Sequence, residues 1–171
     1  MSSRFDDPGL PERIGRIGRR KPAVMPLIQT GNLSEIIFAT VCTKDRKPLL
    51  ANDAAHRVLI EAWKAADHWQ VGRYVVMPDH VHLFCAPAKR TALPVHRWIS
   101  YWKSLVTQSW PNEEDKPLWL TRAWDTQLRH GESYTGKWHY VQHNPVRHGL
   151  VQNANDWPCQ GELNTLPWHD A

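Results

Sequence analysis

The stretch VGRYVVMPDHVHLFCA, residues 71–86, decides the fold. Its two apolar runs, 71–77 and 80–86, are separated only by Pro78 and Asp79, a break typical of an antiparallel hairpin. Successive side chains of a strand point to opposite faces, so His80 and His82 share one face. Two imidazoles on one face of a rigid strand form a ready pair of metal ligands. The alternative is a pair of surface or core histidines that are hydrogen-bonded to their neighbours.

A strand and a helix are predicted before the hairpin. Residues 36–42, IIFATVC, are apolar and β-rich, and the polar turn at 43–49 closes this buried strand. A helix is predicted from Asp53, which can cap it. Apolar side chains recur in this helix at the spacing of one face: Ala55, Leu59, Ala62, Trp63 and Ala66.

Further elements are predicted after the hairpin. A second helix starts near Thr91, with Pro94 tolerated in its first turn. Its predicted inner stripe is Val95, Trp98, Trp102, Leu105 and Ser109, with Arg97 and Lys103 off the stripe. A further strand falls within residues 118–129, and the residues from 153 onward are predicted to be irregular. This order predicts an α+β fold with helices packed on an antiparallel sheet, one face of which is available for a ligand.

A third helix is predicted over residues 132–143, because Asn144 precedes Pro145 and that position disfavours helix. Tyr134, Trp138 and Val141 share its core face. Tyr140 and Asn144 are four residues apart and project together from another face. An amide oxygen can ligate a hard metal ion, and the phenol would lie beside it. The alternative is a surface tyrosine and an asparagine that only ends the helix.

Composition restricts the class of protein. A chain of 171 residues fits one domain, and its net charge of +4 with a pI of about 9.1 favours a polyanionic partner. Ten tryptophans suit a core or cleft wall, and also stacking on unpaired bases. Three cysteines without C-x-x-C spacing argue against a disulfide framework or a cysteine zinc site, and favour a reducing cytoplasm. No apolar run approaches the length of a membrane span, so no membrane partner is expected.

The first 33 residues are rich in glycine, proline and arginine. Such a stretch cannot form much core by itself. We interpret it either as an extended basic arm or as a solubilising tail.

Several ordered blocks resemble a known family. YVVMPDHVHLF (74–84) and KWHYVQHNPVRHGLV (137–151), together with ATVCTKDRKPLLA (39–51) and the helix around YWKSLV (101–106), resemble the REP-associated tyrosine transposases. These are single-tyrosine members of the HUH nuclease superfamily. The resemblance runs from about residue 34 to 157. It divides the chain into a basic arm (1–33), a transposase domain (34–157) and a C-terminal tail (158–171).

The resemblance implies a ferredoxin-like (RRM-like) antiparallel sheet, the HUH nuclease fold, whose central strand carries the metal-binding pair His80 and His82. It implies Tyr140 as the nucleophile, Asn144 as the residue that completes the metal site, and Mg²⁺ or Mn²⁺ as the cofactor. Tyr134 is a rival nucleophile, but it lies on the predicted core stripe. His148 stands where alanine is more usual in the family.

The implied activity is that of a metal-dependent single-stranded DNA endonuclease and strand transferase, a tyrosine transposase. It would nick and join palindromic hairpin repeats through a covalent 5′-phosphotyrosine, which keeps the broken strand activated for religation. A divalent cation would polarise the scissile phosphate. The expected partner is single-stranded or hairpin DNA and not a small molecule, the protein would be a monomer or homodimer, and the location would be the nucleoid in the cytoplasm.

Basic side chains are predicted to hold the DNA backbone. They are Arg19, Arg20, Lys21, Lys44, Arg46, Lys47, Lys103, Arg129, Lys137 and Arg147. Two other functions are considered. One is a hairpin-binding module that no longer cuts DNA. The other is a metal hydrolase of small phosphoesters, which would need a carboxylate near the histidines, and Asp79 is the only adjacent one.

Overall fold

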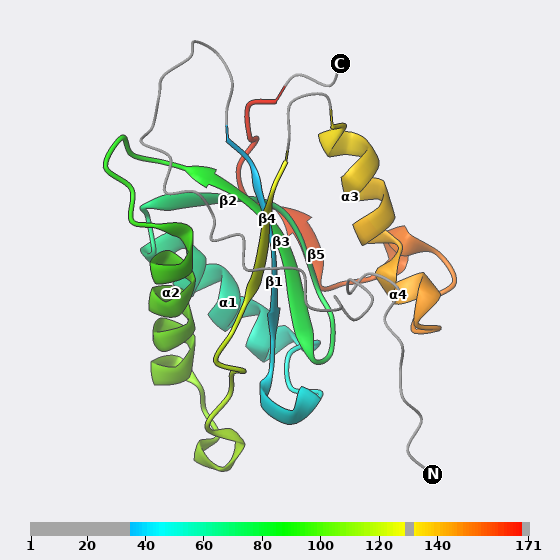
Figure 1. Ribbon diagram of the computed structural model, residues 1–171. Helices are drawn as coiled ribbons and strands as arrows, with labels where there is room; N and C mark the ends of the chain where they lie inside the picture. The colour runs from blue at the N-terminus through cyan, green and yellow to red at the C-terminus, as the bar shows by residue number, and fades with distance from the viewer. Residues whose placement is uncertain (1–34, 129–131, 169–171) are drawn as a thin grey trace, which may run out of the picture.

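The computed structural model describes residues 35–128 and 132–168. They form one five-stranded antiparallel sheet in the order β4-β1-β3-β2-β5, with helices on both faces (Figure 1). The elements in chain order are β1 (Ile37–Cys42), η1 (Lys44–Arg46), α1 (Asp53–Ala65), β2 (Trp69–Val76), β3 (His80–Pro87), α2 (Val95–Ser109), η2 (Glu113–Asp115), β4 (Trp124–Gln127), α3 (Tyr134–Gln142), α4 (Asn144–Arg147), η3 (Ala154–Asp156) and β5 (Gln160–Glu162).

The predicted α+β class and antiparallel sheet are confirmed. The order β1-α1-β2-β3-α2-β4 is that of a ferredoxin-like unit, to which α3, α4 and β5 are added. Figure 1 shows α1 and α2 on one side of the sheet and α3 and α4 on the other. In the described ranges, no helix is both long and apolar enough to cross a membrane.

The hairpin of β2 and β3 forms as predicted. The Met77 amide donates to the His80 carbonyl at 2.8 Å and closes the turn. In the register of β3 against β1, His82 lies opposite Thr40 and His80 opposite Cys42. Because directly opposed residues of a sheet point to the same face, these four side chains share one face.

Each face of the sheet buries its own core. On the side of α1 and α2, the core includes Leu59, Trp98 and Trp102, all fully buried. On the other side, Phe84 of β3 packs edge-on against Tyr134 of α3, with ring centroids 4.9 Å apart. The helix α3 therefore packs on the face of the sheet that carries the two histidines.

Gly72 of β2 permits the close packing of α3 on that sheet. A Cβ atom at this position would lie 2.6 Å from the Leu166 side chain and 2.9 Å from the Tyr134 hydroxyl. The pairing of β2 with β3 shifts register between Val71 and Tyr74, as expected of a bulge at such a glycine.

Some predicted boundaries differ in the structure. Asn52, rather than Asp53, caps α1 by accepting a hydrogen bond from the Ala55 amide. Pro94 is the residue before α2 and not part of its first turn. Asn144 was predicted to disfavour helix, but it starts the short helix α4 directly after α3. Pro145 lies in the first turn of α4, where a missing N–H costs little.

The prediction that the residues from 153 onward are irregular is wrong in part, because Gln160–Glu162 form β5 and pair with β2. The predicted stripe of α2 is also partly wrong. Ser109 is exposed, whereas Lys103 is buried and donates from Nζ to the Leu120 carbonyl at 2.8 Å. Burial lowers the Lys103 pKa.

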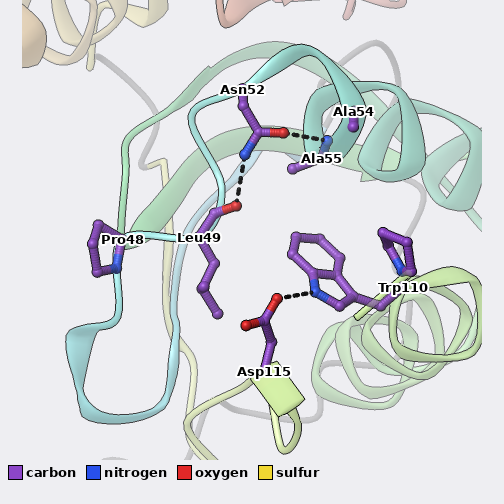
Figure 2. A pocket seen from close by; sticks show the side chains of 8 residues that line it. Pro48, Leu49, Asn52, Ala54, Ala55, Trp110 and Asp115 are labelled. Carbon is purple, nitrogen blue, oxygen red and sulfur yellow. Dashed lines mark hydrogen bonds between the residues drawn. The ribbon is translucent and has the colours of Figure 1, made fainter. Parts of the chain in front are cut away.

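A hollow of about 260 Å³ lies between the residues that lead into α1 and the end of α2 (Figure 2). Its polar side chains are engaged with one another or with backbone. Asn52 caps α1 and donates to the Leu49 carbonyl, and Asp115 accepts from the Trp110 indole at 2.8 Å. This hollow lies at the helices of the other face and has no part in the histidine cluster.

We predict that Leu59→Ala lowers the free energy of unfolding by about 2–5 kcal/mol, because it opens a cavity between α1 and the sheet. Urea denaturation measures this change. Arg57→Ala, an exposed position on the same helix, is the control and should unfold at nearly the parent's urea concentration. Equal stability of the two variants would contradict the assigned core.

Candidate active site

The two histidines occupy the central strand of the sheet and are almost wholly enclosed. His80 and His82 are each 1% exposed. Their rings lie at 78° to one another with centroids 4.6 Å apart, and the two Nε2 atoms are 3.1 Å apart. Both imidazoles therefore present the same nitrogen to one point, as the predicted pair of metal ligands requires.

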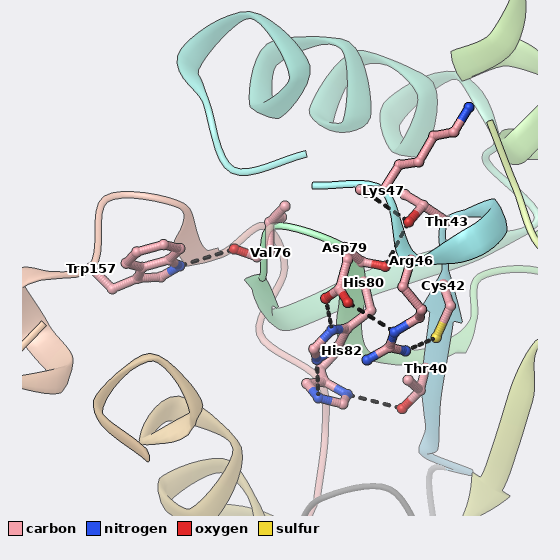
Figure 3. A network of polar contacts seen from close by, with 10 residues as sticks. All are labelled: Thr40, Cys42, Thr43, Arg46, Lys47, Val76, Asp79, His80, His82 and Trp157. Atoms are coloured by element: carbon pink, nitrogen blue, oxygen red, sulfur yellow. Dashed lines mark hydrogen bonds and ion pairs between the residues drawn. The ribbon is translucent and has the colours of Figure 1, made fainter. Parts of the chain in front are cut away.

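A hydrogen-bond chain fixes both rings from their other nitrogens (Figure 3). His80 Nδ1 lies 2.7 Å from Asp79 Oδ1, and His82 Nδ1 lies 2.9 Å from Thr40 Oγ1. A carboxylate only accepts, so His80 Nδ1 carries a proton and its Nε2 keeps a lone pair when the ring is neutral. Histidine ligands of metals are commonly oriented in this way by a carboxylate or another polar group on the second nitrogen.

The surroundings of His82 keep this ring suited to bind a cation. Burial, followed by the charges of His80 and Arg147, lowers the His82 pKa well below its usual value. His82 is therefore neutral at pH 7, with a lone pair to offer. Partial burial opposes ionisation of Asp79, but the His80 hydrogen bond and the charges of His80 and Arg46 outweigh it and hold the pKa of this carboxyl below its usual value.

Arg46, in η1 directly after β1, joins the same hydrogen-bond network. Its Nε lies 2.8 Å from Asp79 Oδ2, and its Nη1 donates to the Cys42 sulfur at 2.8 Å. Arg46 and the preceding Asp45 have φ angles of 55° and 56°, in the left-handed region that side chains disfavour. Such strain is commonly found where a side chain is aimed at a functional group.

The helices α3 and α4 bring the phenol and the amide together. Tyr140 is 49% exposed, whereas Asn144 is only 1% exposed. The Arg147 guanidinium lies 4.0 Å from the centre of the Tyr140 ring and also donates to Asn144 Oδ1. Arg147 thus joins the two predicted site residues, and its charge also acts on His82.

The donor set is partly assembled for a metal ion. Two converging imidazole nitrogens fit a divalent cation, and Asn144 Oδ1 would supply a hard oxygen once Arg147 releases it. Across residues 35–128 and 132–168, no three side chains of histidine, cysteine, aspartate or glutamate are grouped to hold one ion. The remaining ligands would therefore have to come from the amide, from water or from substrate oxygens.

Sequence reasoning missed three contributors to the site. Thr40 is a polar residue in the apolar run 36–42, which was the available signal for its contact with His82. Asp79 was noted only for its position next to His80. His148, whose ring centroid lies 6.4 Å from that of His80, was assigned no role, although its departure from the family pattern marked it.

Comparison with known proteins gives two relatives. A Haemophilus influenzae protein with the provisional name REP-associated tyrosine transposase is 24% identical over 136 residues, which cover 72% of this chain and 77% of the relative. The Escherichia coli REP-associated tyrosine transposase is 27% identical over 90 residues, 53% of this chain and 52% of the relative. This chain is similar to proteins named REP-associated tyrosine transposase. The resemblance predicted from the sequence is confirmed, although no family model matches the chain.

The fold agrees with that relationship. A solved REP-associated tyrosine transposase bound to a REP hairpin superposes with a TM-score of 0.61 at 24% identity, covering 74% of this chain and 75% of that one. This likeness confirms the predicted fold class.

The residues predicted to contact DNA differ in exposure and in their place on the sheet. Lys44 and Lys47 are exposed at η1, next to the histidine end of β3, and Lys137 projects from α3 over the Phe38 ring. Lys103 is buried on the opposite side of the sheet and engaged with a carbonyl, so the structure does not place it on a surface that DNA could reach. Four predicted contacts lie outside the described residues: Arg19, Arg20, Lys21 and Arg129.

We predict that Thr40→Val weakens Mn²⁺ binding by about tenfold, because His82 loses the hydroxyl that orients its ring while the core keeps its shape. Isothermal titration of the metal-free protein with MnCl₂ measures this affinity. Thr107→Val, which removes a hydroxyl from α2 on the other side of the sheet, should bind like the parent. Unchanged affinity in Thr40→Val would show that its hydroxyl does not orient the metal ligand.

Proposed function

We propose that this chain is a metal-dependent single-stranded DNA endonuclease and strand transferase of the HUH type, which nicks and joins hairpin repeats through a covalent phosphotyrosine. One observation carries the proposal. The exposed phenol of Tyr140 and the paired imidazoles lie on the same side of the sheet, and Arg147 contacts the Tyr140 ring and donates to Asn144 Oδ1.

Tyr140 is the proposed nucleophile. Its phenol oxygen forms a bond to the scissile phosphorus, and the bond from phosphorus to the 3′-oxygen breaks. The phenol proton leaves to solvent, and the departing oxygen takes up a proton to become a 3′-hydroxyl. In strand transfer the reverse occurs, since a 3′-hydroxyl attacks the phosphotyrosine and releases Tyr140.

His80 and His82 are the proposed ligands of Mg²⁺ or Mn²⁺, with Asn144 completing the set. When bound, the cation would polarise the scissile phosphate and stabilise the charge that develops on the leaving oxygen. Asp79 and Thr40 hold the two rings so that both Nε2 atoms stay directed at one point.

The proposed substrate is a palindromic hairpin of DNA with unpaired flanks. The REP hairpin bound by the related transposase supports this class of substrate. The exposed cations Lys44 and Lys47 and the cation Lys137 would contact its phosphates, and Arg147 offers a planar guanidinium beside the nucleophile. Arg19, Arg20, Lys21 and Arg129 remain predicted contacts. A protein acting on such repeats would work at the nucleoid.

A hairpin-binding module that does not cut is the second candidate. It is favoured by the hydrogen bond from Arg147 to Asn144 Oδ1, which occupies the oxygen proposed as a metal ligand. A hydrolase of small phosphoesters is disfavoured, because the one adjacent carboxylate, Asp79, is directed at His80 Nδ1 and not at the converging Nε2 atoms.

The nucleophile is tested with Tyr140→Phe, which removes one oxygen and no packing volume. We expect this variant to bind a REP-like hairpin with the parent's affinity, but to form neither a nick nor a covalent adduct in Mn²⁺. Denaturing gels of 5′- and 3′-labelled hairpins, with peptide mapping of the adduct, measure both products.

The matched control is Tyr134→Phe. Tyr134 is 6% exposed, and its hydroxyl accepts from the Arg73 amide, while burial, the largest influence, raises its pKa. This phenol is therefore hard to reach and to ionise, and the variant should keep its activity. An adduct on Tyr134, or cutting that persists in Tyr140→Phe, would overturn the assignment. Binding without cutting by the parent would favour the silent module.

The metal ligands are tested with His80→Ala and His82→Ala. We expect each variant to lose cleavage and to bind Mn²⁺ at least tenfold more weakly. Hairpin affinity should change little, because backbone contacts lie elsewhere, and retained affinity also shows that the variant is folded. Full cleavage by either variant at limiting Mn²⁺ would be incompatible with the proposed ligand pair.

A further inference from the structure

The strands β1 and β4 form a second region of the histidine-bearing face. Trp124 of β4 lies directly opposite Thr40, and Thr126 lies opposite Phe38. Opposed residues point to the same face, so Trp124 and Thr126 share the face of His82. The helix α3 packs on this face over β2, two strands further along the sheet from β1.

The direction of the Trp124 side chain is supported by its neighbour. Asp125 lies opposite Ala39, a residue of the core beneath α1 and α2. Burial raises the pKa of Asp125, and the charge of the nearby His96 on α2 opposes that rise. Because Asp125 points toward α2, strand alternation directs Trp124 to the opposite, histidine-bearing face.

Trp124 presents a large apolar surface there. It is 43% exposed, although an indole gains much by burial. Single exposed apolar side chains are ordinary, but this one adjoins the candidate site. It lies opposite the threonine whose hydroxyl bonds His82, and β4 is two strand spacings, about 10 Å, from β3.

Between the indole and the helix lies a row of flat and cationic groups. The Phe38 ring stacks on His82 with centroids 5.5 Å apart and planes at 21°, and Lys137 Nζ lies 5.2 Å from the Phe38 centroid. Aromatic faces combined with cations are how proteins hold unpaired nucleotides, the cations taking phosphates and the rings taking bases. The row favours nucleic acid over an apolar protein segment as the occupant.

We propose that Trp124 is a stacking platform for an unpaired base that flanks the hairpin, next to the phosphate held at the histidine pair. This inference rests on the proposed function and adds a base-binding position on β4. A base attached to that phosphate, or to the next one along, would lie on the indole while its strand crosses β1. Stacking of this kind tolerates any base, so the platform sets the path of the strand and not its sequence.

The experiment uses the full chain and two labelled DNA probes, one hairpin with short unpaired extensions and the same hairpin without them. Fluorescence anisotropy in EDTA measures binding without cutting. Trp124→Ala should bind the extended probe about 5- to 150-fold more weakly than the parent does. Its affinity for the probe without extensions should not change, and Trp124→Phe should recover most of the loss.

Tyr101→Ala is the matched control, since Tyr101 is 48% exposed on α2, on the opposite side of the sheet. It should bind both probes like the parent. An abasic site introduced at each unpaired position in turn locates the stacked base. With the abasic site at that position, the parent and Trp124→Ala should bind the probe equally well. The stacked base is then absent, so removing the indole has no further effect.

The outcomes separate this inference from the proposed function. If the parent binds neither probe, the proposed function and the stacking platform are both overturned. If the parent binds and Trp124→Ala binds the extended probe equally well, only the platform is overturned. An equal loss on both probes, or a change in sedimentation that shows Trp124 to hold two copies together, also overturns it.

Discussion

The register of β3 between β1 and β2 is the constraint on which the candidate site depends. Side chains alternate along a strand, so a slip of one residue would turn His80 and His82 into the core beneath α1 and α2. In the observed register His82 pairs with Thr40 and His80 with Cys42 of β1. The short turn at Pro78 and Asp79 fixes the register of β3 against β2. The central position of β3 in turn gives both rings neighbours on two sides.

The buried imidazoles are compatible with a stable fold because their nitrogens are satisfied. A buried polar group without a hydrogen-bond partner costs about 1–3 kcal/mol. Asp79 and Thr40 occupy the outer nitrogens, and the inner ones face each other. The inner contact is the one that a cation could replace, so the groups that orient the rings need not move when one binds. Tyr140, by contrast, is exposed at the surface, where the Arg147 guanidinium lies over its ring.

The sequence predicted the parts of the fold that local patterns specify. The hairpin, α1 and β1 have strong periodicity, and the histidine spacing alone places both rings on one face. The sequence pattern did not predict interactions between residues that lie far apart along the chain. Thr40 contacts His82 only because β1 pairs with β3, and Lys103 finds its hydrogen-bond acceptor at Leu120, 17 residues further along the chain. The three residues of β5 are too few for a pattern, and they are ordered by pairing with β2.

The segment that follows Trp157 has a consequence for where the folding unit ends. Cys159 fills the core beneath α1 and α2, and its carbonyl accepts from the Val76 amide. A few residues later Leu166 fills the core beneath α3, against Gly72. This short segment therefore contributes a side chain to the core on each face of the sheet. A polypeptide cut at residue 157 would lose filling on both sides of the sheet at once, so we expect the segment to unfold together with the site helix as one cooperative unit.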